Sequence, residues 1–495
     1  MRKAVAHLMG GNLLSKVLGL GREVFVAALF GTGAVNGAFR IAQTGTLVPI
    51  NFFTSDSLNA VFIPLYKRYL NESRAKADRL FWLVFGLFAI VSTIIVAGLW
   101  WGAPVCVSVL APGLEPDTAK LAAEMLQVMA LSVPFYLLTA LLNYLSMAHD
   151  DHIPMASRAS VQSIGLAGGA LVAYLTHEPL CFAWGFTASY VVFSGWVWHR
   201  LASAGFLPWT NGWTRTEVSA GLSAFWQALR PILLLPVFLQ GNIVTERVVA
   251  SLIGLVAVSA LDYARFITET MLFLVSMPIA FAGLSSWSGL VPAVIQEKLH
   301  RIVVVMLWVG IPVSAFLAVY ADLIVQIAFA RGAFDAESKR VTVSIIRGTS
   351  WGLWAQMLAY VLVKALSAQL RNRAVLVVMV VALASNATIN LLFYRQLGAL
   401  TLGLGNAAYG LVLLVGTLSA LGLWRDLIQN GWRIASILTG YIALVVWVPL
   451  PANKWASIAL AGLIAVAYWG GWVLLMPRFR QFVFDAIGVD EGRKA

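Results

Sequence analysis

The chain has 495 residues, of which 60% are hydrophobic and only 11% are charged, and its mean hydropathy is +0.83. Soluble domains carry about 25% charged residues, so the composition excludes a soluble globular protein and indicates an integral membrane protein. The formal net charge of +12 would also suit a nucleic-acid-binding protein. In a membrane protein, however, excess Lys and Arg is typical of cytoplasmic loops, and we expect no nucleic-acid partner.

Fourteen apolar stretches, each long enough to cross a bilayer as a helix, follow one another along the chain. They predict an all-α integral membrane protein with about 14 transmembrane helices. In chain order the predicted spans are 8–31, 34–62, 80–102, 121–147, 154–175, 180–199, 226–252, 257–289, 302–325, 342–368, 374–394, 399–423, 433–451 and 455–476.

Charged residues gather in four of these spans. The first span contains "NLLSKVLGLGREVFVAALFG", although a charge at the bilayer centre costs about 2.5–3.5 kcal/mol. Charged residues inside membrane spans mark functional sites, so we expect spans 1, 2, 7 and 8 to line a central cavity. The residues concerned are Lys16, Arg22, Glu23, Arg40, Asp56, Glu246, Arg247, Asp262, Arg265 and Glu269.

The distribution of Lys and Arg outside the spans predicts the orientation. The N-terminal "MRK", the run "YKRYLNESRAKADR" and the tail "PRFRQ" all fall on the same side of the membrane in the fourteen-span arrangement. By the positive-inside rule that side is the cytoplasm. Both termini are therefore predicted to be cytoplasmic, as an even number of spans requires.

A weak internal repeat divides the chain. "SVLAPGLEPDTAK" precedes span 4 and "IAFARGAFDAESK" precedes span 10, which places Gly113 and Gly332 about 220 residues apart. "VAALFG" and "VASLIG" align Gly31 with Gly254 at a similar spacing. Six spans per period make a parallel repeat, the plan of transporters that open a central cavity alternately to either side. We therefore predict a six-helix lobe over 1–205, a second over 206–425, and two extra helices with a cytoplasmic tail over 426–495.

Two interpretations of the clustered charges remain open. Surplus cations suit an anionic diphosphate, which Arg binds through a planar fork and Lys binds as a point charge. Glu23 alone cannot neutralise both Lys16 and Arg22. The alternative is structural, because Asp262 and Glu269 lie three and four residues from Arg265, spacings that allow ion pairs within one helix.

Motifs for other chemistry are not evident. We find no P-loop, no G-x-G-x-x-G and no metal-ligand spacing among the histidines and cysteines. We therefore expect a transporter without cofactor or metal, and not an enzyme.

Several stretches carry a family resemblance. "SKVLGLGREVFVAALFGTG" followed by "AFR" resembles the opening of the MurJ (MviN) family, and "AFARGAFDAES" resembles that family's loop before its tenth span. "HIPMAS" and "MPIAFAGLSSWSGLVP" also fit the family pattern. The resemblance covers most of residues 8–425, and the two further spans match the family's total of fourteen.

The resemblance implies a fold, a substrate and a site. The family belongs to the multidrug/oligosaccharidyl-lipid/polysaccharide (MOP) exporter superfamily. Its members flip lipid II, the undecaprenyl-diphosphate-linked peptidoglycan precursor, across the bacterial inner membrane by alternating access. Lipid II, membrane lipids and cell-wall synthesis enzymes are then the expected partners, and spans 13 and 14 are expected to flank a groove for the isoprenoid tail. Lys16, Arg22 and Arg265 match cavity cations and Arg40 is a further candidate, with Asp56, Glu246, Arg247, Asp262 and Glu269 as secondary cavity candidates.

The sequence departs from the family at three places. Gly37 stands where the family usually has an acid, Ile50 stands where it has an arginine, and the "EGAFS" segment reads "SDSLN" over Ser55–Asn59. Arg40 or Asp56 could compensate. These departures keep open a flippase for another lipid-linked oligosaccharide, such as a capsule, exopolysaccharide or O-antigen unit.

Two other classes remain as alternatives. A cation-coupled multidrug exporter shares the twelve-span plan but would be expected to centre its cavity on carboxylates. An integral-membrane glycosyltransferase would be expected to have longer outer loops.

Overall fold

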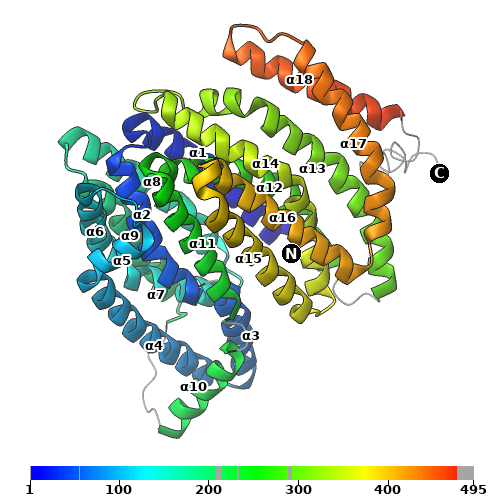
Figure 1. Cartoon of the computed structure of the whole chain (residues 1–495). Helices are drawn as coiled ribbons and strands as arrows, with labels where there is room; N and C mark the ends of the chain where they lie inside the picture. The colour runs from blue at the N-terminus through cyan, green and yellow to red at the C-terminus, as the bar shows by residue number, and fades with distance from the viewer. Residues whose placement is uncertain (1, 55, 208–214, 231–233, 288–291, 476–495) are drawn as a thin grey trace. The chain divides into compact units, whose positions relative to one another are not determined.

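The computed structural model describes residues 2–54, 56–207, 215–230, 234–287 and 292–475, and within these ranges all regular structure is helical (Figure 1). The helices are α1 Arg2–Phe30, α2 Ala34–Thr54, α3 Asp56–Glu72, α4 Arg74–Trp101, α5 Ala103–Leu110, α6 Pro116–Ala130, α7 Val133–Ala148, α8 Ile153–Thr176, α9 Leu180–Ser203, α10 Arg215–Leu229, α11 Leu234–Ile253, α12 Leu255–Trp287, α13 Pro292–Ala328, α14 Ala336–Ala368, α15 Asn372–Leu397, α16 Leu400–Leu421, α17 Trp424–Trp447 and α18 Lys454–Leu475.

The predicted all-α class is confirmed, and every predicted span falls on a helix or on a consecutive helix pair. Span 4 is the pair α6 and α7, which meet at a bend of 44°, and span 7 falls on α10 and α11, which meet at 60°. Among the described residues, seven helices are long and apolar enough to cross a membrane, or nine if each bent pair is one span. The charge-bearing helices α1, α2 and α12 are not among the seven. The total of fourteen crossings therefore stays a prediction.

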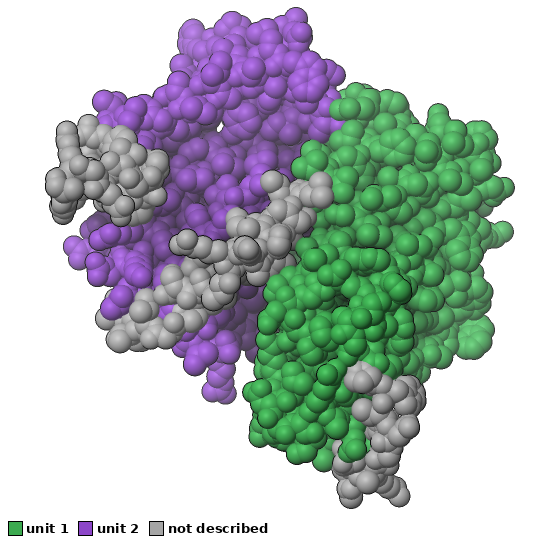
Figure 2. Space-filling model, turned by 180° about the vertical axis from the view of Figure 1, so that it is seen from behind, with its two compact units in different colours: residues 1–266, 329–342, 383–402 green, residues 267–328, 343–382, 403–495 purple. Residues whose placement is uncertain are grey.

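The helices form two compact units, which Figure 2 distinguishes by colour. Unit 1 comprises residues 1–266, 329–342 and 383–402, and unit 2 comprises residues 267–328, 343–382 and 403–495. The repeat-based lobes, with their boundaries at 205 and 425, stay a prediction alongside this grouping.

Small residues bring helices into close contact inside unit 1. A Cβ atom built on Gly169 of α8 would lie 2.6 Å from the Cα of Gly185 on α9, and one built on Gly165 would lie 2.4 Å from the Cβ of Ser189. Helices in membranes associate through such close backbone approach, because lipid tails provide no hydrophobic force that drives helices together. Glycine is therefore required where α8 and α9 cross.

The two C-terminal helices pack within unit 2. Both α17 and α18 contact α13, and the rings of Trp469 on α18 and Trp308 on α13 lie 6.1 Å apart. The hydroxyl of Tyr468 donates a hydrogen bond of 2.7 Å to the carbonyl of Ile437 on α17. Aromatic side chains of α18 therefore contact both α13 and α17.

A pair of glycine substitutions on one helix tests the α8–α9 crossing. Gly169→Val should lower the free energy of unfolding by about 1–3 kcal/mol, because the added methyl groups overlap the α9 backbone. Gly168→Val adds the same groups at an exposed position with nothing within 4 Å and should be nearly neutral. Thermal unfolding of the purified protein in detergent measures both, and equal midpoints would contradict the close crossing.

Candidate functional site

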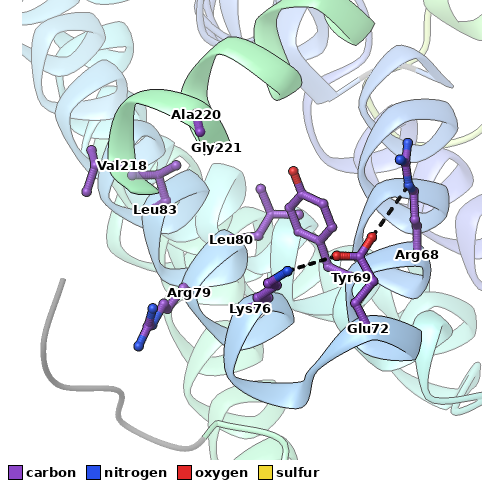
Figure 3. A pocket seen from close by; sticks show the side chains of 10 residues that line it. All are labelled: Arg68, Tyr69, Glu72, Lys76, Arg79, Leu80, Leu83, Val218, Ala220 and Gly221. Carbon is purple, nitrogen blue, oxygen red and sulfur yellow. Dashed lines mark hydrogen bonds and ion pairs between the residues drawn. The ribbon is translucent and has the colours of Figure 1, made fainter. Parts of the chain in front are cut away.

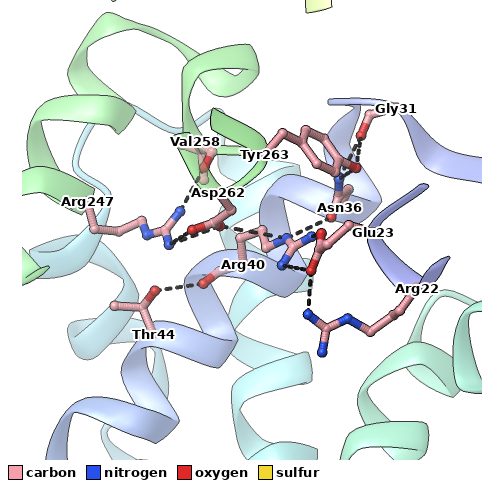
Figure 4. A network of polar contacts seen from close by, with 10 residues as sticks. All are labelled: Arg22, Glu23, Gly31, Asn36, Arg40, Thr44, Arg247, Val258, Asp262 and Tyr263. Atoms are coloured by element: carbon pink, nitrogen blue, oxygen red, sulfur yellow. Dashed lines mark hydrogen bonds and ion pairs between the residues drawn. The ribbon is translucent and has the colours of Figure 1, made fainter. Parts of the chain in front are cut away.

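The carboxylate of Glu23 on α1 is the centre of a buried polar network in unit 1 (Figure 4). It accepts a hydrogen bond of 2.6 Å from the guanidinium of its neighbour Arg22. It also pairs with Arg40 of α2, whose two terminal nitrogens reach both of its oxygens. One carboxylate therefore holds two arginines from two helices.

Arg40 continues the network toward α12. Its Nε atom lies 3.7 Å from the carboxylate of Asp262, and it also donates to the Asn36 side chain at 3.2 Å. Asp262 in turn accepts two hydrogen bonds, of 2.9 and 3.1 Å, from Arg247 of α11. Charges of alternating sign thus connect α1, α2, α12 and α11, the helices that correspond to predicted spans 1, 2, 8 and 7.

Two uncharged residues complete this network. Asn36 donates to the carbonyl oxygen of Gly31 at 2.6 Å, and the Tyr263 hydroxyl donates to the same oxygen at 3.1 Å. The Arg40 guanidinium lies over the Tyr263 ring, 5.6 Å from its centre. Sequence reasoning missed both residues, although Asn36 lies one helical turn before Arg40, where a polar partner would face it.

A second ion pair lies on the same two helices, α11 and α12. Arg265 pairs with the buried Glu246, which also accepts a hydrogen bond of 2.7 Å from Asn386 of α15. Asn390 donates to Asn386 at 2.5 Å. The sequence analysis also missed these two asparagines, because it followed charges and α15 carries none in its apolar middle. Their i,i+4 spacing on one face of a span was the available signal.

The sequence left open an ion pair of Arg265 with Asp262 or Glu269 on the same helix, but the ion pairs of the structure join different helices. Arg265 and Asp262 each pair with a residue of α11, namely Glu246 and Arg247. Glu269 of the same helix is exposed. These ion pairs therefore connect α12 to α11.

The remaining predicted site residues differ in their surroundings. Lys16 is half-buried on α1 and its ammonium lies 5.9 Å from the ring centre of Phe266. The side chain of Asp56 lies outside the described residues. The structure therefore brings Arg22, Glu23, Arg40, Asp262 and Arg247 into one network and Arg265 and Glu246 into a second.

Exposure separates the cations into two groups. The side chains of Arg40 and Arg247 are 7% and 5% exposed, whereas those of Arg22 and Arg265 are 19% and 21% exposed. Including Lys16, five cations face three paired acids, which leaves a surplus of two positive charges in this set. The more exposed cations are the ones able to accept an anion.

Two departures from the family pattern have packing reasons. A Cβ atom on Gly37 would lie 2.4 Å from a methyl group of Leu255, so a side chain at position 37 would require the Leu255 side chain to move. Ile50 is fully buried. Arg40 is engaged by Glu23 and Asp262, so it has a role in this network that does not depend on an acid at position 37.

The loop "AFARGAFD" closes tightly onto the end of α1. Gly31 and Gly332 have φ values of +54° and +58°, which glycine adopts without strain. A Cβ atom on Gly332 would lie 2.1 Å from the carbonyl oxygen of Ala28, to which Ala333 donates a backbone hydrogen bond of 2.9 Å. The closeness of two backbones explains why glycine stands at both positions.

Side chains extend this contact between the α1–α2 corner and the start of α14. The hydroxyls of Thr32 and Ser338 lie 2.7 Å apart. The Asp335 carboxyl accepts hydrogen bonds from the side chain and from the backbone N–H of Ser338, and these bonds, the side-chain one most strongly, hold its pKa below the usual value. Asp335 thereby satisfies a free N–H group at the start of α14.

Comparison with known proteins places these features in context. A model of the family described as "Lipid II flippase MurJ" matches residues 26–467. A probable lipid II flippase MurJ of Synechocystis is 28% identical over 466 residues, which cover 87% of this chain and 84% of that protein. One of Rhizobium meliloti is 25% identical over 510 residues, with coverages of 94% and 91%.

Solved structures share the fold. A lipid II flippase MurJ in an inward closed conformation has a TM-score of 0.82 and 17% identity, covering 97% of this chain and 99% of that one. An inward-facing multidrug transporter of the MATE family, in the MOP superfamily, has a TM-score of 0.65 and 14% identity, with coverages of 85% and 99%. The helical architecture is therefore one that the superfamily shares.

Removing the central carboxylate tests the network. Glu23→Gln should lower the free energy of unfolding by about 3–5 kcal/mol, because buried Arg40 loses its closest counter-charge. The double variant Glu23→Gln/Arg40→Gln should recover part of that loss, since it also removes the buried guanidinium of Arg40 and leaves only the more exposed Arg22 without its acid. Thermal unfolding in detergent measures both variants.

The matched control for this prediction is Glu269→Gln, which removes an exposed carboxylate from α12. It should change stability by less than about 0.5 kcal/mol. If Glu23→Gln and Glu269→Gln had equal effects, the Glu23 network would not be a structural centre.

Proposed function

Because the chain belongs to the MurJ lipid II flippase family, we propose that it moves lipid II, an undecaprenyl-diphosphate-linked peptidoglycan precursor, across the bacterial inner membrane. The observation that carries this proposal is the family match over residues 26–467, which includes the network on α2, α11 and α12. The proposed activity is transport and not enzymatic catalysis, so no covalent step is required.

We propose that Lys16, Arg22 and Arg265 receive the diphosphate. Arg22 and Arg265 are the more exposed arginines of the two networks, and they pair with Glu23 and Glu246, respectively. A guanidinium can accept a second anion through its remaining N–H groups, in the planar geometry that suits phosphate oxygens. Arg40 and Arg247, which are buried, would then act indirectly by holding Glu23 and Asp262 in place.

Alternating access is the mechanism that fits this site. Only two conformations with different affinities for the substrate are needed. The corner between α1 and α2 contacts the start of α14 where Ala28 accepts the Ala333 hydrogen bond and Thr32 contacts Ser338. These contacts would have to break when the cavity opens toward that end, and they involve mostly backbone and hydroxyl groups, which are inexpensive to separate.

The proposed orientation has both termini in the cytoplasm, as the distribution of Lys and Arg predicts. Lipid II would then enter from the cytoplasmic leaflet and leave toward the periplasm, where cell-wall synthesis enzymes consume it. The membrane potential would favour the return of an empty, positively charged cavity, by about 2.3 kcal/mol per charge per 100 mV for a full crossing.

The appended helices α17 and α18 would accommodate the isoprenoid tail. From Ile434 to Leu475 the only charged residue is Lys454, which begins α18, so the pair presents an apolar surface. Deletion of residues 431–476 should abolish transport while the shortened protein still inserts. Unchanged transport by a stably inserted deletion variant would count against the tail-binding role, and its simple alternative is a role in stability.

Depletion of the protein in its native host tests the substrate. Lipid II should accumulate, as measured by mass spectrometry of extracted undecaprenyl-linked intermediates. Accumulation of a capsule, exopolysaccharide or O-antigen intermediate would instead identify the alternative flippase that the Gly37 and Ile50 departures keep open. Energy-dependent export of a cationic dye by the purified protein would favour the multidrug exporter.

Substitution of the accessible cations tests the site. Arg22→Ala and Arg265→Ala should each lower lipid II transport by roughly 30-fold or more, because truncating one member of a desolvated charge pair costs about 2–5 kcal/mol. Lys16→Arg should retain more activity than Lys16→Ala, since it keeps the positive charge. Transport of labelled lipid II in proteoliposomes measures these rates at equal protein incorporation.

The control is Arg395→Ala, which removes an exposed cation from the last turn of α15. It should leave transport unchanged. Normal transport by both Arg22→Ala and Arg265→Ala would mean that these charges are structural and that the diphosphate binds elsewhere.

A further inference from the structure

A second polar site lies away from the Glu23 network, in a cavity of about 360 Å³ between α3, α4 and α10 (Figure 3). The polar part of its lining comes from the end of α3 and the first turns of α4. The lining residues are Arg68, Tyr69, Glu72, Lys76, Arg79, Leu80, Leu83, Val218, Ala220 and Gly221.

The lining carries more positive than negative charge. Arg68, Lys76 and Arg79 contribute three cations, whereas Glu72 is the one acid among the lining residues. Glu72 contacts two of the cations, at 3.1 Å from the Lys76 ammonium and 3.8 Å from the Arg68 guanidinium. Because Lys76 and Arg68 are both exposed, a soluble or membrane-bound anion can reach them.

Part of the cavity lining is apolar. Leu80 and Leu83 belong to the long apolar run of α4, and Val218 contributes from α10. The cavity therefore lies where the basic start of α4 gives way to the apolar segment that is long enough to cross a membrane. Trp82 of α4 and Trp198 of α9, whose rings lie 6.1 Å apart, stand at the same level of α4. Tryptophan is enriched at the membrane–water interface, which indicates headgroup depth.

Helix α10 supports this placement. Its side chains Leu222 and Trp226 are exposed to 36% and 56%, although both are large and apolar. A short helix with exposed apolar side chains beside a basic cavity is typical of an element that lies along a membrane surface.

We propose that this cavity binds the phosphate headgroup of an anionic phospholipid of the surrounding bilayer, such as phosphatidylglycerol. Lys76 contacts the phosphate oxygens through charge-assisted hydrogen bonds, and Arg79 and Arg68 add positive charge on either side of it. Leu80, Leu83 and Val218 contact the glycerol and the first acyl carbons. Basic pockets at the ends of transmembrane helices recognise anionic lipid in this way. The site is separate from the substrate cations and does not depend on the flippase function.

Titration of the full-length protein in detergent with dioleoylphosphatidylglycerol, followed by native mass spectrometry, tests the proposal. The double variant Lys76→Gln/Arg79→Gln should bind roughly 25-fold more weakly than the parent, at about fivefold for each cation removed. The control Lys298→Gln/Arg301→Gln removes two exposed cations from α13 and should bind like the parent. Equal losses in both double variants would mean nonspecific attraction and would overturn the assigned site.

Two further variants should change the affinity for the lipid in opposite directions. Glu72→Gln removes the competing acid and should tighten binding by about fivefold. Ala220→Phe fills the apolar part without altering any charge and should weaken binding. If Glu72→Gln bound no more tightly and Ala220→Phe had no effect, the cavity would not be the binding site.

The source of the phosphate is tested separately. Phosphatidylcholine, which has no net charge, should bind more weakly than phosphatidylglycerol, and inorganic phosphate at equal concentration should not displace the lipid. Displacement by inorganic phosphate would identify a site for a free anion and overturn the lipid assignment. All of these measurements record binding and not transport, so they can fail while lipid II flipping is intact, and the reverse.

Discussion

Burial of the Glu23 carboxylate is the constraint on which the rest of the site depends. A lone carboxylate in an apolar interior would be strongly destabilising, so it must be paired and hydrogen-bonded. Arg22 and Arg40 do this from α1 and α2. Arg40 is itself buried and approaches Asp262, which pairs with Arg247 on α11. Satisfying one acid therefore orders a chain of five charges across four helices.

This chain of charges has a positive residue at each end, and the ends are not equivalent. Arg247 also donates to the carbonyl of Val258 and is almost completely enclosed. Arg22 is the more exposed end. Because an alternating chain that begins and ends on arginine cannot be neutral, the excess charge is available where water can reach it. The geometry thus separates arginines that hold the helices from an arginine that could meet a ligand.

The sequence predicted the helical class and the grouping of charges, because hydropathy and the cost of a buried charge are local properties of the chain. It could not predict which charges pair. The spacing of Asp262 and Arg265 would allow an ion pair between them within α12, yet each pairs with a residue of α11. Which pairs form depends on how α11 and α12 are rotated relative to each other after the break at Gly254. Uncharged partners such as Asn386 were missed because the site residues were selected by their charge, and an amide side chain has none.

The ion pairs also constrain how a substrate could act on the protein. A diphosphate that binds Arg22 would share that guanidinium with Glu23, and one that binds Arg265 would share it with Glu246, which weakens each existing ion pair. Glu23 would still be held by Arg40, and Glu246 by the amide of Asn386, so neither carboxylate would be left without a partner. The anion would therefore loosen the Arg22–Glu23 pair within α1 and the Arg265–Glu246 pair that joins α12 to α11, and each carboxylate would keep a hydrogen-bond partner. A ligand that weakens contacts in one conformation shifts the equilibrium toward the other, which is what alternating access requires.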